Sequence, residues 1–329
     1  MTMTQISPAA RRARPQAPQW LTAPETLITL LLVVIFIGCA AAIPRFMDAG
    51  YLLDRSSLYI EVGLMALAMT FVIVSGQIDL SCASMLALVA TVSAVAHARW
   101  GVPIGVAIAA APVFGGCLGL VNGWLVAKLG LPSLVVTLAT MAVYRGLAQV
   151  LLGDHSQALP LQVAGIDRYF VAGIPVPLLT LGLLALAGGL VLHRTVLGRW
   201  VTATGTNSQA SRYAGIPVAG VTLAVFVFSG VMAGLAGVIM ASRLGVARYD
   251  HAMGLELEVI TAVVLGGASI FGGRGTIYGT MIALALMATI QTGMGVANIK
   301  AEYQQAANGA LLVLAVLLSN LLLGWRNRS

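Results

Sequence analysis

The chain has 329 residues, of which 59% are hydrophobic and 9% are charged, and its mean hydropathy is +0.95. Soluble domains carry roughly 25% charged residues, so this composition excludes a water-soluble globular protein. The net charge of +7 comes from basic residues in short loops between apolar runs, which indicates orientation in a bilayer and not nucleic-acid binding.

The apolar runs have the length of membrane-spanning helices, about 17–25 residues, and not the roughly ten-residue alternation of barrel strands. We therefore expect an all-α polytopic membrane protein with about ten transmembrane helices. Residues 1–24 are polar and contain three prolines, and we expect a disordered cytoplasmic tail there, followed by a single transmembrane domain over 25–325. The expected spans lie near 26–43, 57–75, 80–97, 102–127, 132–152, 176–192, 221–240, 257–270, 277–297 and 303–323.

An even number of spans puts both termini on one side, and the loop charges indicate which side. With the tail inside, Lys and Arg are more frequent in the inner segments than in the outer loops, as in cytoplasmic loops of other membrane proteins. Most acidic loop residues then fall outside, and only Glu25 falls clearly inside. This assignment places both termini and the 193–220 segment in the cytoplasm.

The polar stretch Val201–Val218 separates two long apolar runs within that segment. Thr206 and Gln209 have capping-box spacing, which predicts a short surface helix over 207–214 with Ala210 and Tyr213 on one side. Gly215 suits the position after the helix end, and Pro217 prevents continuation. One interpretation is an ordinary capped loop helix. The other is a handle by which a partner moves this chain, with contacts from Thr206, Asn207, Gln209, Ala210, Arg212, Tyr213 and Gly215.

Two of the expected spans are interrupted. The sequence SGQIDLS (75–81) is too short and too polar for an ordinary loop, and the eighth span runs into GGASIFGGRGT (266–276). Irregular backbone at membrane depth is tolerated only where protein buries it or where it lines a cavity. We therefore expect broken or short helices along a transport pathway, although the glycines could instead serve close helix packing. The glycines of the second break are Gly266, Gly267, Gly272 and Gly273.

Glycines at every fourth position predict how the helices pack. Gly115, Gly119 and Gly123 recur in the fourth span, and Gly230 and Gly234 recur in the seventh. Helices associate in membranes through close approach at small residues. These faces are expected to hold the subunit together or to hold it against a second copy.

Polar groups at membrane depth are candidates for function. Thr137, Thr140 and Tyr144 share one face of the fifth span, and Arg145 with Gln149 extends it. The alternative is structural pairing, such as Arg145 with Glu61 or Asp79, and Asn122 and Gln291 could equally form interhelical hydrogen bonds. The candidates for a translocation path are Gln77, Asp79, Asn122, Thr137, Thr140, Tyr144, Arg145 and Glu258.

Several motifs are missing from the sequence. It contains no phosphate-binding loop for ATP, and GGRG at 272–275 is not a dinucleotide fingerprint. We find no metal-ligand cluster and no hydrolase motif, and the three cysteines fit neither a metal site nor a disulfide framework. The sequence therefore predicts no enzyme activity and no metal site.

Four segments occur in an order and spacing that identify a family. They are SGQIDLSCASMLAL (75–88), GLVNGWLVAKLGLPSLVVTLATMAVYRGLA (119–148), TGTNSQASRYAGIPV (204–218) and VITAVVLGGASIFGGRGTIYGT (259–280). Together they resemble the membrane permease subunit of bacterial ABC monosaccharide importers of the ribose, xylose, arabinose and rhamnose type. The resemblance covers nearly all of the chain from about residue 25 to 323.

This resemblance implies a type II ABC importer fold in the bacterial inner membrane. It also implies a second permease subunit, identical or different, and two ATP-binding subunits on the cytoplasmic face, which bind the ATP and Mg²⁺ while this chain binds no cofactor. A periplasmic sugar-binding protein would deliver the monosaccharide, and 204–218 matches the family's coupling loop. Gln77 and Cys82 stand where many relatives have Gly and Val. The loop over 153–175 and the later GVARYDHAMGLELEVI resemble the rhamnose or autoinducer-2 branch more than the ribose branch.

The expected mechanism is alternating access, in which ATP binding closes the partner subunits and the helix near 207–214 carries the displacement into the spans. One rival is a secondary transporter in which Asp79 or Glu258 carries a proton or ion. A second rival is a scaffold or receptor without transport activity. The broken helices argue against the scaffold, and the capped cytoplasmic helix argues against the secondary transporter.

Overall fold

The computed structural model describes residues 24–43, 46–165 and 169–326, so the expected tail lies outside the described residues apart from Pro24. The fold is a bundle of helices with two short two-stranded ladders. The helices are α1 (Pro24–Ala42), α2 (Ala49–Ser56), the 3₁₀ helix η1 (Ser57–Tyr59), α3 (Ile60–Val74), α4 (Cys82–Trp100), α5 (Ile104–Leu129), α6 (Ser133–Leu152), α7 (Val176–Arg194), α8 (Val196–Thr206), α9 (Ser208–Tyr213), α10 (Val218–Leu244), α11 (Leu255–Leu265), α12 (Ile277–Val296) and α13 (Ala301–Arg326). The strands are β1 (Gln157–Ala158), β2 (Phe170–Val171), β3 (Ile174–Pro175) and β4 (Val246–Ala247).

Eight helical segments of the described part are long and apolar enough to cross a membrane, and they coincide with eight of the ten expected spans. The all-α polytopic fold is therefore confirmed. The expected span 257–270 corresponds to α11, which ends at Leu265 and at 11 residues is only about 16 Å long, too short for a bilayer core of about 30 Å. The last expected span, 303–323, lies within α13, whose side chains are described only in part.

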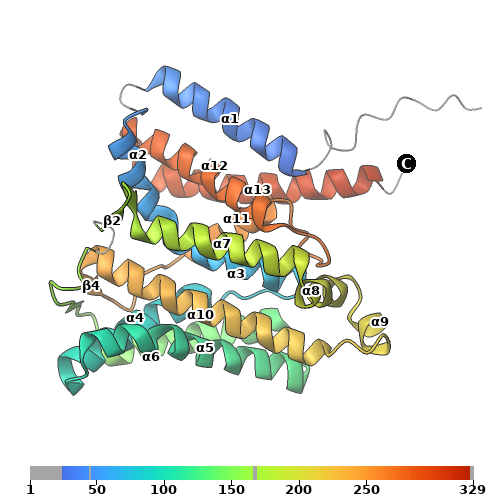
Figure 1. Cartoon of the computed structure of the whole chain (residues 1–329), viewed down its shortest axis with the longest axis horizontal. Coiled ribbons are helices and arrows are strands. Elements are labelled where there is room, and N and C mark those ends of the chain that lie inside the picture. Colours follow the sequence, from blue (N-terminus) through green and yellow to red (C-terminus); the bar gives the residue numbers. More distant parts are fainter. Residues whose placement is uncertain (1–23, 44–45, 166–168, 327–329) are drawn as a thin grey trace, which may run out of the picture.

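Helix α3 forms the centre of the bundle. Every one of its residues is buried, from Ile60 to Val74, because α10, α11, α7 and α12 surround it. A helix that is apolar on all sides is stable only in such a position. In Figure 1, α1 lies at one edge of the bundle and α5 with α6 at the opposite edge, and α7, α3, α10 and α4 lie between them.

The closest helix contact is between α5 and α10, which run antiparallel. A Cβ atom at Gly115 would overlap the carbonyl oxygen of Gly230, and one at Gly119 would overlap the carbonyl oxygen of Phe226. A Cβ at Gly123 would lie 3.1 Å from the Cα of Leu223. The predicted role of these glycines in close packing is therefore confirmed within the subunit, where the two backbones approach each other directly.

The two ends of the bundle differ. Helices α8 and α9 project from one end, which we call the coupling end, and the β1–β4 ladder joins the loops at the other end by pairing Gln157 with Ala247 (Figure 1). The last residues of α13 lie at the coupling end, and Glu25 of α1 accepts a hydrogen bond there from Thr276 over 3.4 Å. Both ends of the described chain are therefore on one side of the bundle.

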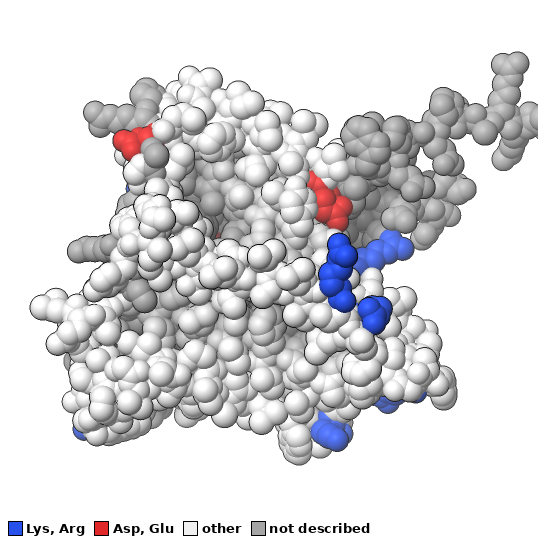
Figure 2. Space-filling model, viewed as in Figure 1, with Lys and Arg blue, Asp and Glu red and all other residues white. Residues whose placement is uncertain are grey.

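Charge is also unequal between the two ends. Figure 2 shows a broad uncharged surface across the middle of the molecule, with Lys and Arg side chains gathered at the end where α8 and α9 lie. In the described part of the chain, the basic residues at the coupling end are Lys128, Arg194, Arg199, Arg212 and Arg274. The uncharged middle is the surface expected to contact lipid tails.

Candidate functional site

The predicted surface helix exists, but its first turn differs from the expectation. Thr206 is the last residue of α8, and its hydroxyl donates to the carbonyl oxygen of Thr202 over 2.9 Å. The N-cap of α9 is Asn207, whose side-chain oxygen accepts from the N–H of Ala210 over 2.9 Å. The predicted capping box of Thr206 and Gln209 is therefore wrong. Asparagine is among the residues most favoured at an N-cap. The residues before it form α8, a helix that was not expected from the sequence.

Helix α9 presents most of the predicted contact residues to the outside. Gln209, Ala210 and Arg212 are exposed, and Tyr213 is 85% exposed. Ser211 is the buried side chain of the helix and faces the bundle. Gly215 follows with φ +81°, a left-handed conformation that suits glycine and ends the turn. The exposed aromatic and basic groups form a small protruding surface.

The coupling end also contains a junction between three backbone segments, made largely of glycines. Gly76 belongs to the break after α3, Gly205 to the last turn of α8, and Gly272 and Gly273 to the break after α11. The N–H of Gly273 donates to the carbonyl oxygen of Val74 over 2.8 Å. We refer to Val74, Gly76, Gly205, Gly272 and Gly273 as the glycine junction.

Three glycines of the junction, Gly205, Gly272 and Gly273, have no room for a side chain. A Cβ at Gly205 would lie 2.7 Å from the nitrogen of Gly273, and one at Gly272 would lie 2.9 Å from the Cα of Gly76. A Cβ at Gly273 would lie 2.5 Å from the hydroxyl oxygen of Thr206. Because the backbones touch directly, a displacement of α8 must displace both breaks or separate them from α8.

The second break is held from the other side by α12. Gly266 packs so closely against Gly279 that a Cβ would lie 2.6 Å from the carbonyl carbon of Gly279. The backbone then turns through Gly267, with φ +91°, and the N–H of Ser269 donates to the carbonyl oxygen of Arg274 over 2.9 Å. The glycines of this break therefore serve close packing, one of the two roles considered from the sequence, and also form the irregular backbone of the break.

Asp79 holds the first break in place. Its carboxylate is fully buried and accepts from the N–H of Ser81 over 2.9 Å and from the hydroxyl of Ser229 on α10 over 2.7 Å. The side-chain amide of Asn122 on α5 donates to the Ser81 hydroxyl over 2.8 Å. Buried carboxylates are stable only when hydrogen-bonded in this way.

The predicted polar face of α6 packs against the same cluster. Thr137, Thr140 and Tyr144 are all buried, so within this chain their shared face contacts protein. The hydroxyl of Thr137 donates to the carbonyl oxygen of Ile78 over 3.2 Å, and that of Tyr144 donates to the carbonyl oxygen of Leu118 over 2.9 Å. Gln77 is partly exposed beside this cluster, whereas Thr140 bonds its own helix.

Arg145 is not paired with Glu61 or Asp79, so that predicted pairing is wrong. Its guanidinium donates to the carbonyl oxygens of Tyr249 and His251, each over 2.6 Å, and thereby holds the loop between α10 and α11. Glu61 instead forms an ion pair with Arg243 over 3.0 Å. Gln149 is exposed and does not extend the buried face of α6.

Glu258 belongs to a separate chain of hydrogen bonds. Its carboxylate accepts from the side-chain amide of Asn308 over 2.8 Å, and the Asn308 oxygen accepts from Gln291 over 2.7 Å. The hydroxyl of Tyr59 donates to the Gln291 oxygen over 2.7 Å. The network joins η1, α11, α12 and α13, so of the two roles left open for Gln291 the structure shows the interhelical hydrogen bonds.

Sequence reasoning missed four residues that complete these arrangements. Gly76 and Gly205 complete the glycine junction, Ser229 completes the Asp79 cluster, and Arg243 pairs with Glu61. Single glycines carry no period that would single them out, and Ser229 and Arg243 depend on contacts across 150 or more residues. Among the described residues, no group of three His, Cys, Asp or Glu side chains could hold a metal ion.

Two interrupted helices within a membrane bundle, both in contact with a surface helix, are characteristic of the transport class of membrane proteins. Comparison with known proteins agrees. Residues 51–316 match the family described as the permease component of the branched-chain amino acid transport system, and the chain belongs to this permease family. It is a transport subunit and not an enzyme.

The similar proteins are permeases, and the similarity extends along nearly their whole length. The autoinducer 2 import system permease protein LsrD of Photorhabdus laumondii is 34% identical over 299 residues, which cover 89% of this chain and 90% of that protein. The L-arabinose ABC transporter permease protein AraH of Azospirillum brasilense is 35% identical over 307 residues, 93% of this chain and 90% of that protein. LsrD of Escherichia coli K12 is 35% identical over 299 residues. No solved structure matches the chain.

Proposed function

We propose that this chain is the membrane-spanning subunit of an ABC importer for a monosaccharide. Two relatives are named as permeases, one of an autoinducer 2 import system and one of an L-arabinose ABC transporter. The alignments to these relatives cover about nine-tenths of this chain. The family match over residues 51–316 includes the two breaks and the coupling end. Membership of the permease family therefore supports the class, and the relatives support the size and chemistry of the substrate.

The proposed location is the bacterial inner membrane, with the coupling end and both termini in the cytoplasm. The excess of basic residues at the coupling end supports this orientation, because cytoplasmic loops of membrane proteins are enriched in Lys and Arg. The opposite end, with the β1–β4 ladder, would then face the periplasm and receive a sugar-binding protein.

The proposed source of energy for transport is an ATPase subunit that binds the coupling end. The sequence has no phosphate-binding loop, so ATP and Mg²⁺ would bind to that partner and not to this chain. The observation that carries the proposal is the direct backbone contact of α8 with both helix breaks at the glycine junction. An ATPase that moves α9 would move α8, and α8 would shift the breaks that border the path.

The path itself is proposed to lie between this chain and a second permease subunit, identical or different. Gln77 is partly exposed and is our first candidate for a side chain on the path. Asp79, Asn122, Thr137, Thr140 and Tyr144 are proposed to border the path by fixing the backbone at the first break. Arg145 and Glu258 are proposed to border it nearer the periplasmic end, since both hold segments there.

Reconstitution tests the proposed function. The chain, its partner ATPase and its binding protein are placed in proteoliposomes, and uptake of radiolabelled L-arabinose and L-rhamnose is measured with and without ATP. We expect uptake only when ATP and the ATPase are both present. An ion-coupled secondary transporter would instead accumulate sugar through the chain alone, driven by a proton or sodium gradient, and that result would contradict the proposal.

A further inference from the structure

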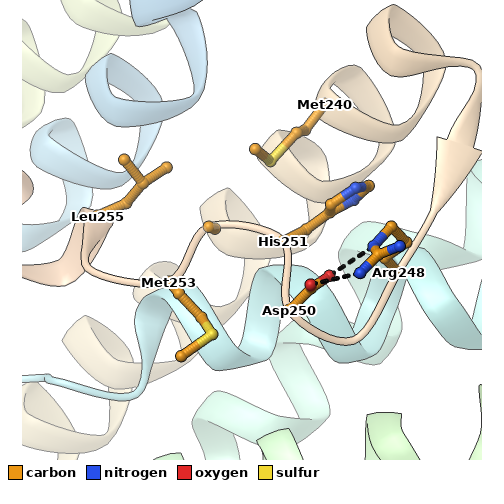
Figure 3. Close-up of a pocket in the computed structure, with 7 residues that line it drawn as sticks. Met240, Arg248, Asp250, His251, Met253 and Leu255 are labelled. Atoms are coloured by element: carbon orange, nitrogen blue, oxygen red, sulfur yellow. Dashed lines mark hydrogen bonds and ion pairs between the residues drawn. The ribbon is translucent and has the colours of Figure 1, made fainter. Parts of the chain in front are cut away.

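The loop between α10 and α11 forms a hollow at the end of the bundle opposite α8 and α9. Its cavity volume is about 420 Å³, and it is open to the outside. Small-molecule sites usually measure roughly 300–1,000 Å³, so the hollow has room for a monosaccharide. The residues around it are Met240, Arg248, Asp250, His251, Ala252, Met253 and Leu255, most of which Figure 3 shows as sticks.

The polar groups of the hollow carry no net charge as a set. Arg248 donates to both oxygens of Asp250, over 2.7 and 2.6 Å, in the paired arrangement visible in Figure 3. Both side chains remain partly exposed, 40% for Arg248 and 31% for Asp250. An anion would have to compete with Asp250 for the guanidinium, and a cation would have to compete with Arg248. The hollow therefore favours a neutral ligand that can both donate and accept hydrogen bonds.

His251 also lines the hollow. Its Nδ1 atom is buried and has no hydrogen-bond partner within the described residues, so a ligand in the hollow can meet only the other ring nitrogen, Nε2. Burial lowers the pKa of His251, an effect that nearby Asp250 partly offsets, so the ring is neutral at pH 7. A neutral imidazole has one donor and one acceptor nitrogen, and a sugar hydroxyl can pair with Nε2 in either role.

The backbone of the loop is held in one shape before any ligand arrives. Arg145 donates to the carbonyl oxygens of Tyr249 and His251, and Ala252 is buried with φ +60°, a conformation that alanine seldom adopts. Met240, Met253 and Leu255 add an apolar wall, and methionine adapts to ligands of differing shape. A preformed hollow loses little entropy when it is filled.

We propose that this hollow is an outer subsite that takes up a neutral, hydroxyl-rich ligand such as a monosaccharide as it passes from the periplasmic side to the path. This inference rests on the proposed function and adds the residues that first contact the substrate. The hollow is shallow and open, so it binds weakly and releases quickly, as transfer requires. Arg145 connects it to α6, whose polar face contacts the first break.

Saturation-transfer difference NMR on the purified chain in nanodiscs tests the subsite. The probes are millimolar L-arabinose and L-rhamnose, with the anion D-gluconate as a comparison. We expect signals for both sugars at least about fivefold above those of gluconate. The millimolar concentrations are needed because the proposed binding is weak. Two substitutions should each reduce the sugar signal to the gluconate level, His251→Leu by removing the imidazole nitrogens and Met253→Trp by filling the hollow.

Met253→Trp is included because it should not impair folding, since Met253 is 68% exposed and its replacement disturbs no packing. The matched control is Leu161→Ser on the same end of the bundle, at a residue that is 91% exposed and outside the hollow, and it should keep the full signal. An equal sugar signal in wild type and Met253→Trp would overturn the subsite, as would the absence of a signal in wild type. Either result would leave ATP-driven uptake by the reconstituted complex intact, so failure of the subsite is distinguishable from failure of the proposed function.

Discussion

The backbone N–H of Gly273 donates to the carbonyl oxygen of Val74 over 2.8 Å, although 199 positions of the chain separate the two residues. Val74 ends α3, the buried helix at the centre of the bundle, and Gly273 belongs to the break after α11. Gly205 of α8 fits against both residues. Helix α8 is thus in direct backbone contact with the core and with both interrupted segments.

Gly205→Ala tests this contact. A Cβ at this position would lie 2.7 Å from the Gly273 nitrogen and 2.9 Å from the Val74 carbonyl carbon, so α8 must move away from the junction. We expect ATP-driven uptake in proteoliposomes to fall by about tenfold or more, the equivalent of about 1.4 kcal/mol.

The control for that variant is Gly146→Ala in the middle of α6, where a Cβ meets nothing within 4 Å. Alanine is favoured over glycine in a helix by about 0.5–1 kcal/mol, so Gly146→Ala should leave uptake unchanged or raise the stability slightly. Equal uptake in Gly205→Ala and Gly146→Ala would mean that the glycine junction transmits nothing.

Gly230→Ala tests the packing of α5 against α10. The added Cβ would lie 2.8 Å from the Gly115 carbonyl carbon and 2.9 Å from the Gly119 nitrogen, and neither backbone can yield without separating the helices. Overpacking costs about 1–3 kcal/mol, so the thermal unfolding midpoint in detergent should fall. Gly182→Ala, on an open face of α7, should leave the midpoint in place. A wild-type midpoint for Gly230→Ala would refute the close approach.

Ser229→Ala tests how the first break is held. The hydroxyl of Ser229 donates to the buried carboxylate of Asp79, and its loss leaves an acceptor oxygen without that donor. An unsatisfied buried group costs about 1–3 kcal/mol, and more when it is charged, so the free energy of unfolding should fall by at least this amount.

Thr289→Ala is the matched hydroxyl deletion. Its hydroxyl bonds only the Ala285 carbonyl of its own helix, at an exposed position, and its loss should change the unfolding free energy by less than about 0.5 kcal/mol. Similar losses in Ser229→Ala and Thr289→Ala would show that Asp79 does not depend on α10.

His251 predicts a pH dependence of stability. Burial lowers its folded-state pKa below the ordinary value of 6.5, so the native protein resists protonation of this ring more than the unfolded chain does. The contribution is fully present above 6.5 and is lost as the pH falls through and below that value. The charged groups that act on the ring are Asp250, Arg248, Arg243 and Arg145.

The measurement is the difference in unfolding midpoint between wild type and His251→Leu, followed from pH 8 to pH 5. Other titrating groups act equally on both proteins, so the difference isolates His251. We expect wild type to lose stability relative to the variant on the acid side, and a constant difference would contradict the assignment.

The sequence predicted the features that depend on local pattern. The eight spans follow from apolar runs, the packing of α5 on α10 follows from glycines at every fourth position, and the shared face of Thr137, Thr140 and Tyr144 follows from helical spacing. The two breaks were recognisable because polar and glycine-rich segments interrupt apolar runs. Each of these signals is contained within about thirty residues.

Two expectations were wrong because the sequence does not show where one helix ends and the next begins, or which distant groups meet. The Thr206–Gln209 spacing suggested a capping box, but α8 extends through Thr206 and leaves Asn207 as the cap. Arg145 was expected to meet a carboxylate, yet it bonds two loop carbonyls more than 100 residues away, because Glu61 is already paired with Arg243. The sequence lists the charged groups at membrane depth but not which of them meet.

Photo-cross-linking at Tyr213 tests whether an ATPase subunit contacts α9 on the cytoplasmic side of the membrane. A photoreactive amino acid replaces Tyr213, which is 85% exposed on α9, or Leu161 at the opposite end, in the assembled complex in inverted membrane vesicles. The account predicts that the Tyr213 position cross-links to a nucleotide-binding ATPase subunit on the cytoplasmic side and that the Leu161 position does not. The contrary result would be no cross-link to an ATPase at Tyr213 together with labelling of a Tyr213→Cys variant by a membrane-impermeant thiol reagent added to intact cells.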